Sequence, residues 1–205
     1  VIAGGSTPTG TPATSALCEE YDGSSWTEVN NIGTARYSSG SCGTQTAALI
    51  FGGGPNPPGP SGNNRGESEE YDGTDWAEGN DLTNPRREIT GCGTQTAGLC
   101  AAGRAGNETT GESRVATSEE YNGTSWAEGN DVNVAKGNAR TFGIQTAAIL
   151  AGGQTAPSSY LDTVESYDGT SWTEVGDLNV GKAWMGAAGI ATDGLVYGGN
   201  SSPSA

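Results

Sequence analysis

Short apolar runs alternate with polar, glycine-rich stretches along the chain, and the pattern returns about every 50 residues. Each return contains an apolar run that ends in two small residues, as at 49–53, and a Tyr-Asp/Asn-Gly-x-x-Trp segment. No window shows the 3.6-residue periodicity of an amphipathic helix. A fixed period of this length is the sequence signature of a repeat architecture. Its tyrosines and tryptophans are Tyr21, Tyr71, Tyr121 and Tyr167, and Trp26, Trp76, Trp126 and Trp172.

Four short strands per repeat follow from this pattern. The first is rich in Gly and Ser, as at 37–44, and the second is the apolar run after a tight turn. The third ends at Tyr-Asp-Gly, where Asp-Gly favours a turn, and the fourth begins at the Trp. The chain supplies three strands of one repeat, three complete sets of four and two more strands, so we expect seventeen. We therefore also expect that the chain is part of a longer ring or completes its ring with another chain, with a closed four-bladed ring as the alternative.

The repeated residues resemble the kelch family. The resemblance rests on the Gly-Gly after the second strand, the Glu and Tyr-Asp of the third and the Trp that opens the fourth, and it covers essentially the whole chain. It implies an all-β fold, a β-propeller with four-stranded kelch-like blades, about four of them in this chain. We expect residues 1–205 to form a single propeller region with repeats at approximately 1–48, 49–98, 99–148 and 149–194, and a partial repeat at 195–205. The Tyr-to-Trp spacing is shorter than is usual in the family, and Ala102-Gly103 replaces one Gly-Gly pair.

A narrower resemblance concerns the phrase Gly-Thr-Gln-Thr-Ala-Ala at 43–48, with near-copies at 93–98 and 143–148. Together with Tyr-Asp-Gly-Thr-Ser-Trp-Thr-Glu, it is similar to repetitive kelch-like proteins of bacteriophages that infect marine bacteria. The resemblance implies a virion or tail-fibre component, located in the virion or outside the cell, whose partners are other virion proteins or a host-surface receptor or glycan.

Composition excludes several other functions. Leu, Ile, Val and Phe account for 26 of the 205 residues and glycine for 35, a balance that on its own predicts disorder. The repeat changes this expectation, because small residues suit crowded inner strands. No histidine is present, which excludes His-dependent nucleophiles and imidazole metal ligands. Nine basic against 24 acidic residues argue against nucleic-acid binding, and apolar runs of about five residues are far short of the roughly 20 that span a bilayer.

Four of the nine basic residues share one position of the repeat, at the entry to the first strand. One interpretation is a ring of cations around the propeller axis that binds an anion. The other is that each cation pairs with a repeated acid and ties the blades together, and the acidity of the chain favours it. The repeated aromatic residues are likewise most simply explained as packing between blades. The cations are Arg36, Arg86, Lys136 and Lys182, and the acids are Glu19, Glu69, Glu119 and Glu165.

The candidate binding residues lie where the repeats differ. The connections between second and third strands, at 6–16, 54–66, 104–116 and 154–161, vary in length and composition. Long loops on one face of a rigid scaffold commonly carry binding functions. Arg65, Arg104, Arg114 and Tyr160 are the side chains there best suited to anchor a partner. Trp184 joins them, because the other repeats have Ser38, Glu88 and Asn138 in its position.

Neither the cysteines nor the acidic turns indicate a metal or another cofactor. Each of the four cysteines replaces an ordinary small or apolar residue of another repeat, so we expect buried free thiols. The Asp-Gly turns lack the density of oxygen ligands that calcium needs, and a turn-forming role is favoured.

Three functions are consistent with the sequence. The first is a non-enzymatic structural and binding module of a phage virion or tail fibre, which contacts its partner through the variable loops. The second is an extracellular glycan-binding propeller. The third is an enzyme: a copper oxidase is excluded by the missing histidines, and a glycosidase would need two placed carboxylates. We therefore expect no catalytic residues.

Overall fold

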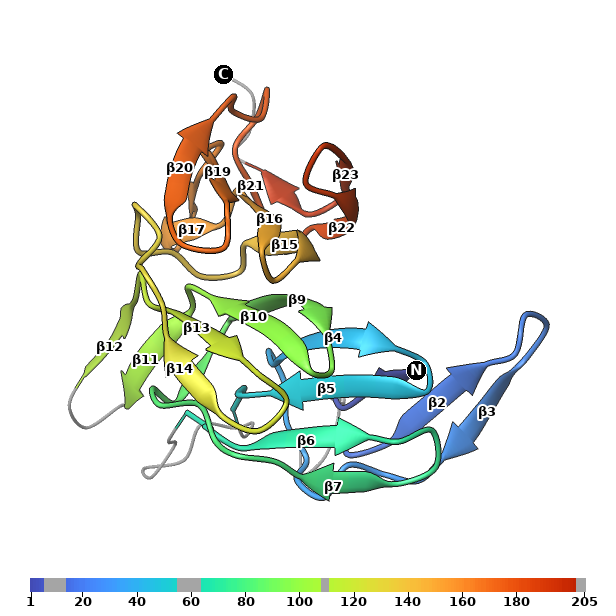
Figure 1. Ribbon diagram of the computed structural model, residues 1–205. Helices are drawn as coiled ribbons and strands as arrows, with labels where there is room; N and C mark the ends of the chain where they lie inside the picture. The colour runs from blue at the N-terminus through green and yellow to red at the C-terminus, as the bar shows by residue number, and fades with distance from the viewer. Residues whose placement is uncertain (6–13, 55–63, 108–110, 202–205) are drawn as a thin grey trace.

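The computed structural model describes residues 1–5, 14–54, 64–107 and 111–201 (Figure 1). In these ranges the protein is all-β, with 24 strands and no helix, and hence no helix long and apolar enough to cross a membrane. The strands form several separate antiparallel sheets that follow one another along the chain.

Five of these sheets correspond to the repeats, and we number them sheet 1 to sheet 5. Sheets 2, 3 and 4 each have four strands in sequential order, whereas sheets 1 and 5 have three and two. Their strands are the seventeen expected from the sequence. Sheet 1 is β1 (Ile2–Ala3), β2 (Cys18–Tyr21) and β3 (Trp26–Val29); sheet 2 is β4 (Gly40–Thr44), β5 (Ala47–Phe51), β6 (Ser68–Tyr71) and β7 (Trp76–Glu78); sheet 3 is β9 (Thr90–Thr94), β10 (Ala97–Ala101), β13 (Ser118–Tyr121) and β14 (Trp126–Glu128); sheet 4 is β15 (Arg140–Ile144), β16 (Ala147–Ala151), β19 (Val164–Tyr167) and β20 (Trp172–Val175); sheet 5 is β22 (Gly186–Ile190) and β23 (Asp193–Tyr197).

The first hairpin of each of sheets 2 to 5 depends on a glycine that no other residue can replace at that position. Gly43 has a φ of 103°, and a Cβ added to it would lie 2.2 Å from the carbonyl oxygen of Ala47. Gly93, Gly143 and Gly189 repeat this geometry. Side chains rarely adopt this backbone conformation. The repeated glycine therefore fixes the tight turn that aligns the first two strands of a sheet.

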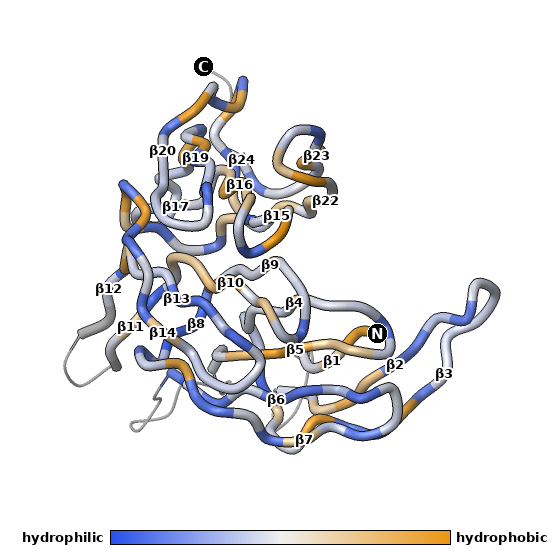
Figure 2. The backbone as a smooth tube through the Cα atoms, in the orientation of Figure 1, coloured by the Kyte–Doolittle hydropathy of each residue, from blue (hydrophilic) through white to orange (hydrophobic). Residues whose placement is uncertain are grey.

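The first strands of sheets 2 to 5 lie against one another, in the order β4, β9, β15 and β22. Buried side chains fill the space between successive sheets. Figure 2 marks β5, one of the strands that supply them, in the colour of hydrophobic residues. The Phe51 ring lies over Gly40 of its own sheet and against Gly91 of the next, where an added Cβ would approach the ring to 2.2 Å and 2.3 Å. Large rings therefore fit against glycines, and few large apolar residues suffice for the core.

Seven further short strands lie outside the five sheets. Two of the four variable connections contain hairpins rather than irregular loops: one joins β11 to β12, and the other joins β17 to β18. Cross-strand hydrogen bonds satisfy backbone groups that an irregular loop would leave to solvent. Most of the connections at 6–16 and 54–66 lies outside the described residues. The seven strands are β8 (Arg86–Arg87), β11 (Arg104–Asn107), β12 (Gly111–Arg114), β17 (Gln154–Ala156), β18 (Ser159–Tyr160), β21 (Lys182–Ala183) and β24 (Asn200–Ser201).

Candidate functional site

The repeated cations form buried ion pairs. Arg36 contacts Glu69 at 2.5 Å, Arg86 contacts Glu119, and Lys136 contacts Glu165 at 2.8 Å, with all three basic side chains fully buried. Each carboxylate lies on the third strand of a sheet and also accepts backbone N–H groups of the connection that enters that sheet, such as that of Gly33. The contacts favour structural ties for these three cations over an accessible ring that binds an anion.

Lys182 and Glu19 have no such pairing. Sheet 5 has no third strand in the part of the chain that the structure describes, so nothing there occupies the position of Glu69 beside Lys182. Glu19 is exposed on β2 of sheet 1. Among the described contacts, neither side chain takes part in an ion pair.

The repeated aromatic residues connect neighbouring sheets. The Tyr121 hydroxyl donates a hydrogen bond of 2.5 Å to Glu70 of the preceding sheet. Trp126 stacks against Tyr121 and meets the edge of the Phe51 ring at a centroid distance of 4.8 Å. Tyr167 repeats the bond to an acidic residue of the preceding sheet at 2.8 Å. These contacts agree with a packing role, whereas Tyr21 and Trp26 of sheet 1 stay 46% and 51% exposed.

A further connection between sheets was not recognised in the sequence. The Gln95 side chain donates hydrogen bonds to two backbone carbonyls of the preceding sheet, those of Ala48 at 3.1 Å and Tyr71 at 2.7 Å. Gln145 makes the equivalent bonds to Gly98 and Tyr121. In the sequence, the repeated Gly-Thr-Gln phrase and its near-copy Gly-Ile-Gln at 143–145 mark the positions of these glutamines.

The turns and cysteines have local roles. The Asp22 side chain accepts the backbone N–H groups of Ser24 and Ser25 at 2.7 Å and 2.8 Å, and Asp72, Asn122 and Asp168 accept the same two bonds in their own turns. These bonds lower the pKa of all three aspartates. The four cysteines are free, and burial raises the pKa of each thiol. The raised pKa keeps the cysteine thiols protonated and unreactive, and the aspartate carboxylates stabilise their own turns.

One position of the repeat carries a different side chain in each sheet. It is occupied by Ser38, Glu88, Asn138 and Trp184, which we call the rim. All four have a φ between 53° and 57°, a conformation that non-glycine residues seldom adopt and that is frequent at functional sites. The backbone N–H groups of Glu88, Asn138 and Trp184 each donate to the carbonyl of the rim residue before them, at 2.9–3.0 Å. The rim is therefore a continuous hydrogen-bonded arc with four chemically different side chains.

Two of the predicted binding residues meet at the rim. Arg104 and Arg114 are opposite each other on β11 and β12, and both contact the Glu88 carboxylate, at 3.4 Å and 3.7 Å. The Asn138 amide donates a third contact to the same carboxylate at 3.0 Å. Glu88 thus organises the cluster, although the sequence indicated only that its position varies.

Two others meet at the end of the same arc. The Tyr160 and Trp184 rings are in edge-to-face contact, with centroids 6.1 Å apart and planes at 72°. Trp184 is 44% exposed. We call the rim together with Arg104, Arg114 and Tyr160 the binding face, because the sequence predicts a binding role for these three residues and for Trp184 of the rim. Arg65 pairs instead with Glu67 at 3.4 Å, and no described contact joins it to this face.

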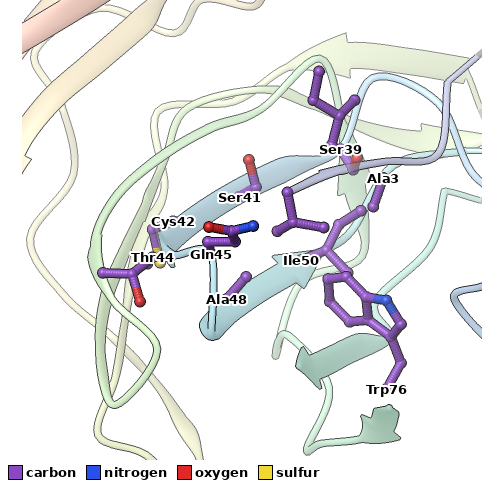
Figure 3. A pocket seen from close by; sticks show the side chains of 12 residues that line it. Ala3, Ser39, Ser41, Cys42, Thr44, Gln45, Ala48, Ile50 and Trp76 are labelled. Carbon is purple, nitrogen blue, oxygen red and sulfur yellow. The ribbon is translucent and has the colours of Figure 1, made fainter. Parts of the chain in front are cut away.

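Described residues of the inner strands line two cavities. One, of about 430 Å³, is located between β1 and β4, where Ile50 and Trp76 supply its apolar side and Ser41 and Gln45 its polar side (Figure 3). The other, of about 420 Å³, lies directly next to the rim and is lined by the first residues of β4, β9, β15 and β22. Both volumes are typical of ligand pockets, which span about 300–1,000 Å³.

Across the described residues, no group of three or more Cys, Asp or Glu side chains is placed to hold a metal ion.

Comparison with known proteins gives a likeness of fold. Neither the protein-family models nor the curated proteins match this sequence. Among solved structures, the one described as "Structure of YjhT" superposes with a TM-score of 0.68 over 84% of this chain, at 12% sequence identity. The matched part is 63% of that structure's own chain. This chain is therefore similar in fold to that protein.

Proposed function

We propose that the five sheets are successive blades of a kelch-like β-propeller. Three observations support this architecture. The blades follow one another in sequence, their first strands lie side by side, and the same acid, tyrosine and tryptophan positions form the contacts between them. Sheets 2 to 4 are complete blades, and sheets 1 and 5 are partial ones.

On this scaffold we propose a non-enzymatic structural and binding module, a component of a phage virion or tail fibre. Its binding face contacts another virion protein or a host-surface partner. The observation that carries the proposal is that the residues between the sheets are repeated, whereas the residues of the binding face are not. Residues between the sheets repeat with the same partners, whereas the rim varies in every repeat and is in contact with Arg104, Arg114 and Tyr160. Varied side chains on a rigid frame are typical of binding proteins.

An enzymatic function has little support from the carboxylates. Glu69, Glu119 and Glu165 are buried in ion pairs with repeated cations. Glu88 is partly exposed but is held by Arg104 and Arg114. A glycosidase needs two carboxyl groups placed to act on the substrate, whereas each of these four carboxylates is held by basic side chains of the chain itself.

A second candidate function is glycan binding outside the cell. It is favoured by the contact between Tyr160 and Trp184, which presents a partly exposed aromatic surface at the rim. Aromatic rings of this kind combine a large apolar surface with a polar edge, a combination suited to a sugar ring.

The two functions are separated by locating the chain and by testing its binding. Purified phage particles are analysed for this chain by mass spectrometry, and the isolated, labelled chain is tested on host cells and on a glycan array. The virion function predicts that the chain is present in particles and binds cells or virion proteins. Absence from particles together with array binding would favour the glycan function instead.

The binding face is tested with Trp184→Ala and Tyr160→Ala, each expected to reduce binding about tenfold or more, as loss of an aromatic anchor does. Arg65→Gln serves as the matched control, because Arg65 lies outside the face and pairs with Glu67. Thermal unfolding verifies that each variant is folded. Equal binding by the Trp184 variant and the wild-type chain would refute this face as the contact surface.

A further inference from the structure

Arg140 differs from the other repeated positions around it. It is the first residue of β15, and the equivalent first residues are Gly40 of β4, Thr90 of β9 and Gly186 of β22. Its cross-strand neighbour is the small Ala151, whereas Gly40 and Gly186 have the rings of Phe51 and Tyr197 opposite them. The space that a ring fills in sheets 2 and 5 is therefore left for an arginine in sheet 4.

Among the described residues, the guanidinium of Arg140 has no ionic partner. It donates one hydrogen bond, to the carbonyl of Ala139 at 3.1 Å, out of the five N–H groups it carries. In the described ranges no carboxylate lies within ion-pair distance of it, although the chain has 24 acidic residues against nine basic ones. Burial lowers the pKa of Arg140 with no carboxylate to offset it, in contrast to Arg36, whose burial is opposed by Glu69. An arginine remains charged in such surroundings.

The cavity beside the rim presents this charge together with hydroxyl groups. Arg140 is the one charged residue of its described lining, and Ser39, Ser41, Thr90, Thr141 and Tyr197 contribute hydroxyls. The Thr90 and Thr141 hydroxyls lie 2.9 Å apart, and the backbone N–H of Thr141 donates to Thr90 at 2.8 Å. These bonds fix the positions of two polar groups in the wall of the cavity.

We propose that this cavity binds a sugar acid, with its carboxylate on Arg140 and its hydroxyls on the Ser and Thr side chains. The planar guanidinium matches a carboxylate through two parallel hydrogen bonds. A polyhydroxylated ligand satisfies the lining, and the volume of about 420 Å³ accommodates one sugar ring. Trp184 directly precedes Met185 and Gly186, which belong to the lining of this cavity. This inference rests on the proposed binding face and adds a small ligand beside it. It does not depend on which macromolecular partner the face contacts.

The test is a titration of the full chain with glucuronate at low ionic strength, followed by calorimetry or by NMR of the Arg140 side chain. We expect saturable binding of glucuronate, weaker binding of acetate and none of glucose. Arg140→Gln is expected to weaken binding about 10- to 100-fold, the usual effect of losing charge-assisted hydrogen bonds. Arg65→Gln is the control, because it removes the same charge at a distance from the cavity.

A second variant keeps Arg140 and blocks its site. Ala187→Glu places a carboxylate on a lining position of β22 and is expected to abolish glucuronate binding. Equal affinity of Arg140→Gln and wild-type chains, equal losses in Arg140→Gln and Arg65→Gln, or equal affinity for acetate and glucuronate would each overturn the sugar-acid site. The proposed docking function is tested separately by the binding of the Trp184 variant to cells or particles. That assay contains no free sugar acid, so its result does not depend on the sugar-acid site.

Discussion

The Arg36 guanidinium lies 2.5 Å from the Glu69 carboxylate, and the two side chains are 0% and 5% exposed. The same guanidinium donates to the backbone carbonyl of Glu67, and Glu69 accepts the N–H of Gly33 at 2.5 Å. This one pair thus holds the connection from sheet 1 against the third strand of sheet 2. Removing either partner would leave a buried charge without compensation.

We therefore expect Glu69→Gln to lower the free energy of unfolding by about 3–5 kcal/mol, the usual effect of breaking a buried ion pair. Glu28→Gln on the exposed face of β3 is the matched control and should change it by less than about 0.5 kcal/mol. Urea unfolding followed by tryptophan fluorescence measures both values. A Glu69 variant as stable as the Glu28 variant would contradict a structural role of the pair.

The hydroxyl of Tyr121 is expected to stabilise the contact between sheets 2 and 3. Tyr121→Phe removes the bond to Glu70 and leaves a carboxylate without its donor, which should cost about 1–3 kcal/mol. Tyr21→Phe is the control, because the equivalent tyrosine of sheet 1 is 46% exposed and has no sheet before it in the described residues. Equal effects of the two substitutions in urea unfolding would show that the bond contributes nothing.

The same tyrosines predict a loss of stability at alkaline pH. Burial and the nearby Glu20 carboxylate raise the pKa of Tyr71 to about 12, above the usual 10. The folded state therefore keeps the proton that the unfolded state releases, so the stabilisation is complete below pH 10 and is lost as the pH rises to about 12. Unfolding curves of Tyr71→Phe and wild type, measured from pH 8 to pH 12, should converge at the alkaline end. Parallel curves would contradict the raised pKa.

Ala102 has a φ of 56° in the position that Gly52 and Gly152 occupy in neighbouring repeats. We expect Ala102→Gly to change the free energy of unfolding by less than about 1 kcal/mol, because relief of the left-handed conformation is offset by a lost methyl and greater chain entropy. Gly52→Ala should cost more than about 2 kcal/mol, because its Cβ would lie 2.5 Å from Ile89 and 2.7 Å from the carbonyl oxygen of Arg86. Calorimetry of both variants tests the comparison, and a mild Gly52→Ala would contradict it.

The strands and the ties between sheets were predictable because the sequence repeats them. Four copies of Tyr-x-Gly-x-x-Trp place the third and fourth strands. Four repeated cations and four repeated acids predict ion pairs, and three such pairs form among the described residues. Composition alone gave the wrong expectation, since it counts apolar residues but not how rings such as Phe51 pack against glycines.

The candidate site was predictable only in part, because it is made where the repeats differ. The variable connections mark Arg104, Arg114 and Tyr160, and the change of residue at its repeat position marks Trp184. That Arg104 and Arg114 meet at Glu88, and Tyr160 at Trp184, depends on the hydrogen-bonded arc of the rim. Nothing in the sequence pattern marks Arg140. Its significance comes from the cavity that it lines and from the absence of a carboxylate beside it among the described residues, and neither feature can be seen in a linear sequence.

The aspartate turns allow a prediction at acid pH, because the third repeat contains a natural variant. Asp72 accepts the backbone N–H groups of Asp75 and Thr74, and these bonds lower the pKa of its carboxyl below 3.8. Asn122 accepts the same two bonds without a charge. A lowered pKa stabilises the folded state above the unfolded value near 4, and this contribution is lost as the pH falls through the folded value.

Asp72→Asn should therefore keep the turn and make stability less sensitive to acid, whereas Asn122→Asp should increase that sensitivity. Unfolding of both variants between pH 2 and pH 7 measures the effect, and NMR titration of the Asp72 carboxyl carbon measures its pKa directly. Asp22 and Asp168, left unchanged, serve as internal references in the same spectra. An Asp72 carboxyl that titrates at or above 3.8 would show that the turn N–H groups do not favour the charged form, and the two substitutions would then leave the acid limb of the stability curve unchanged.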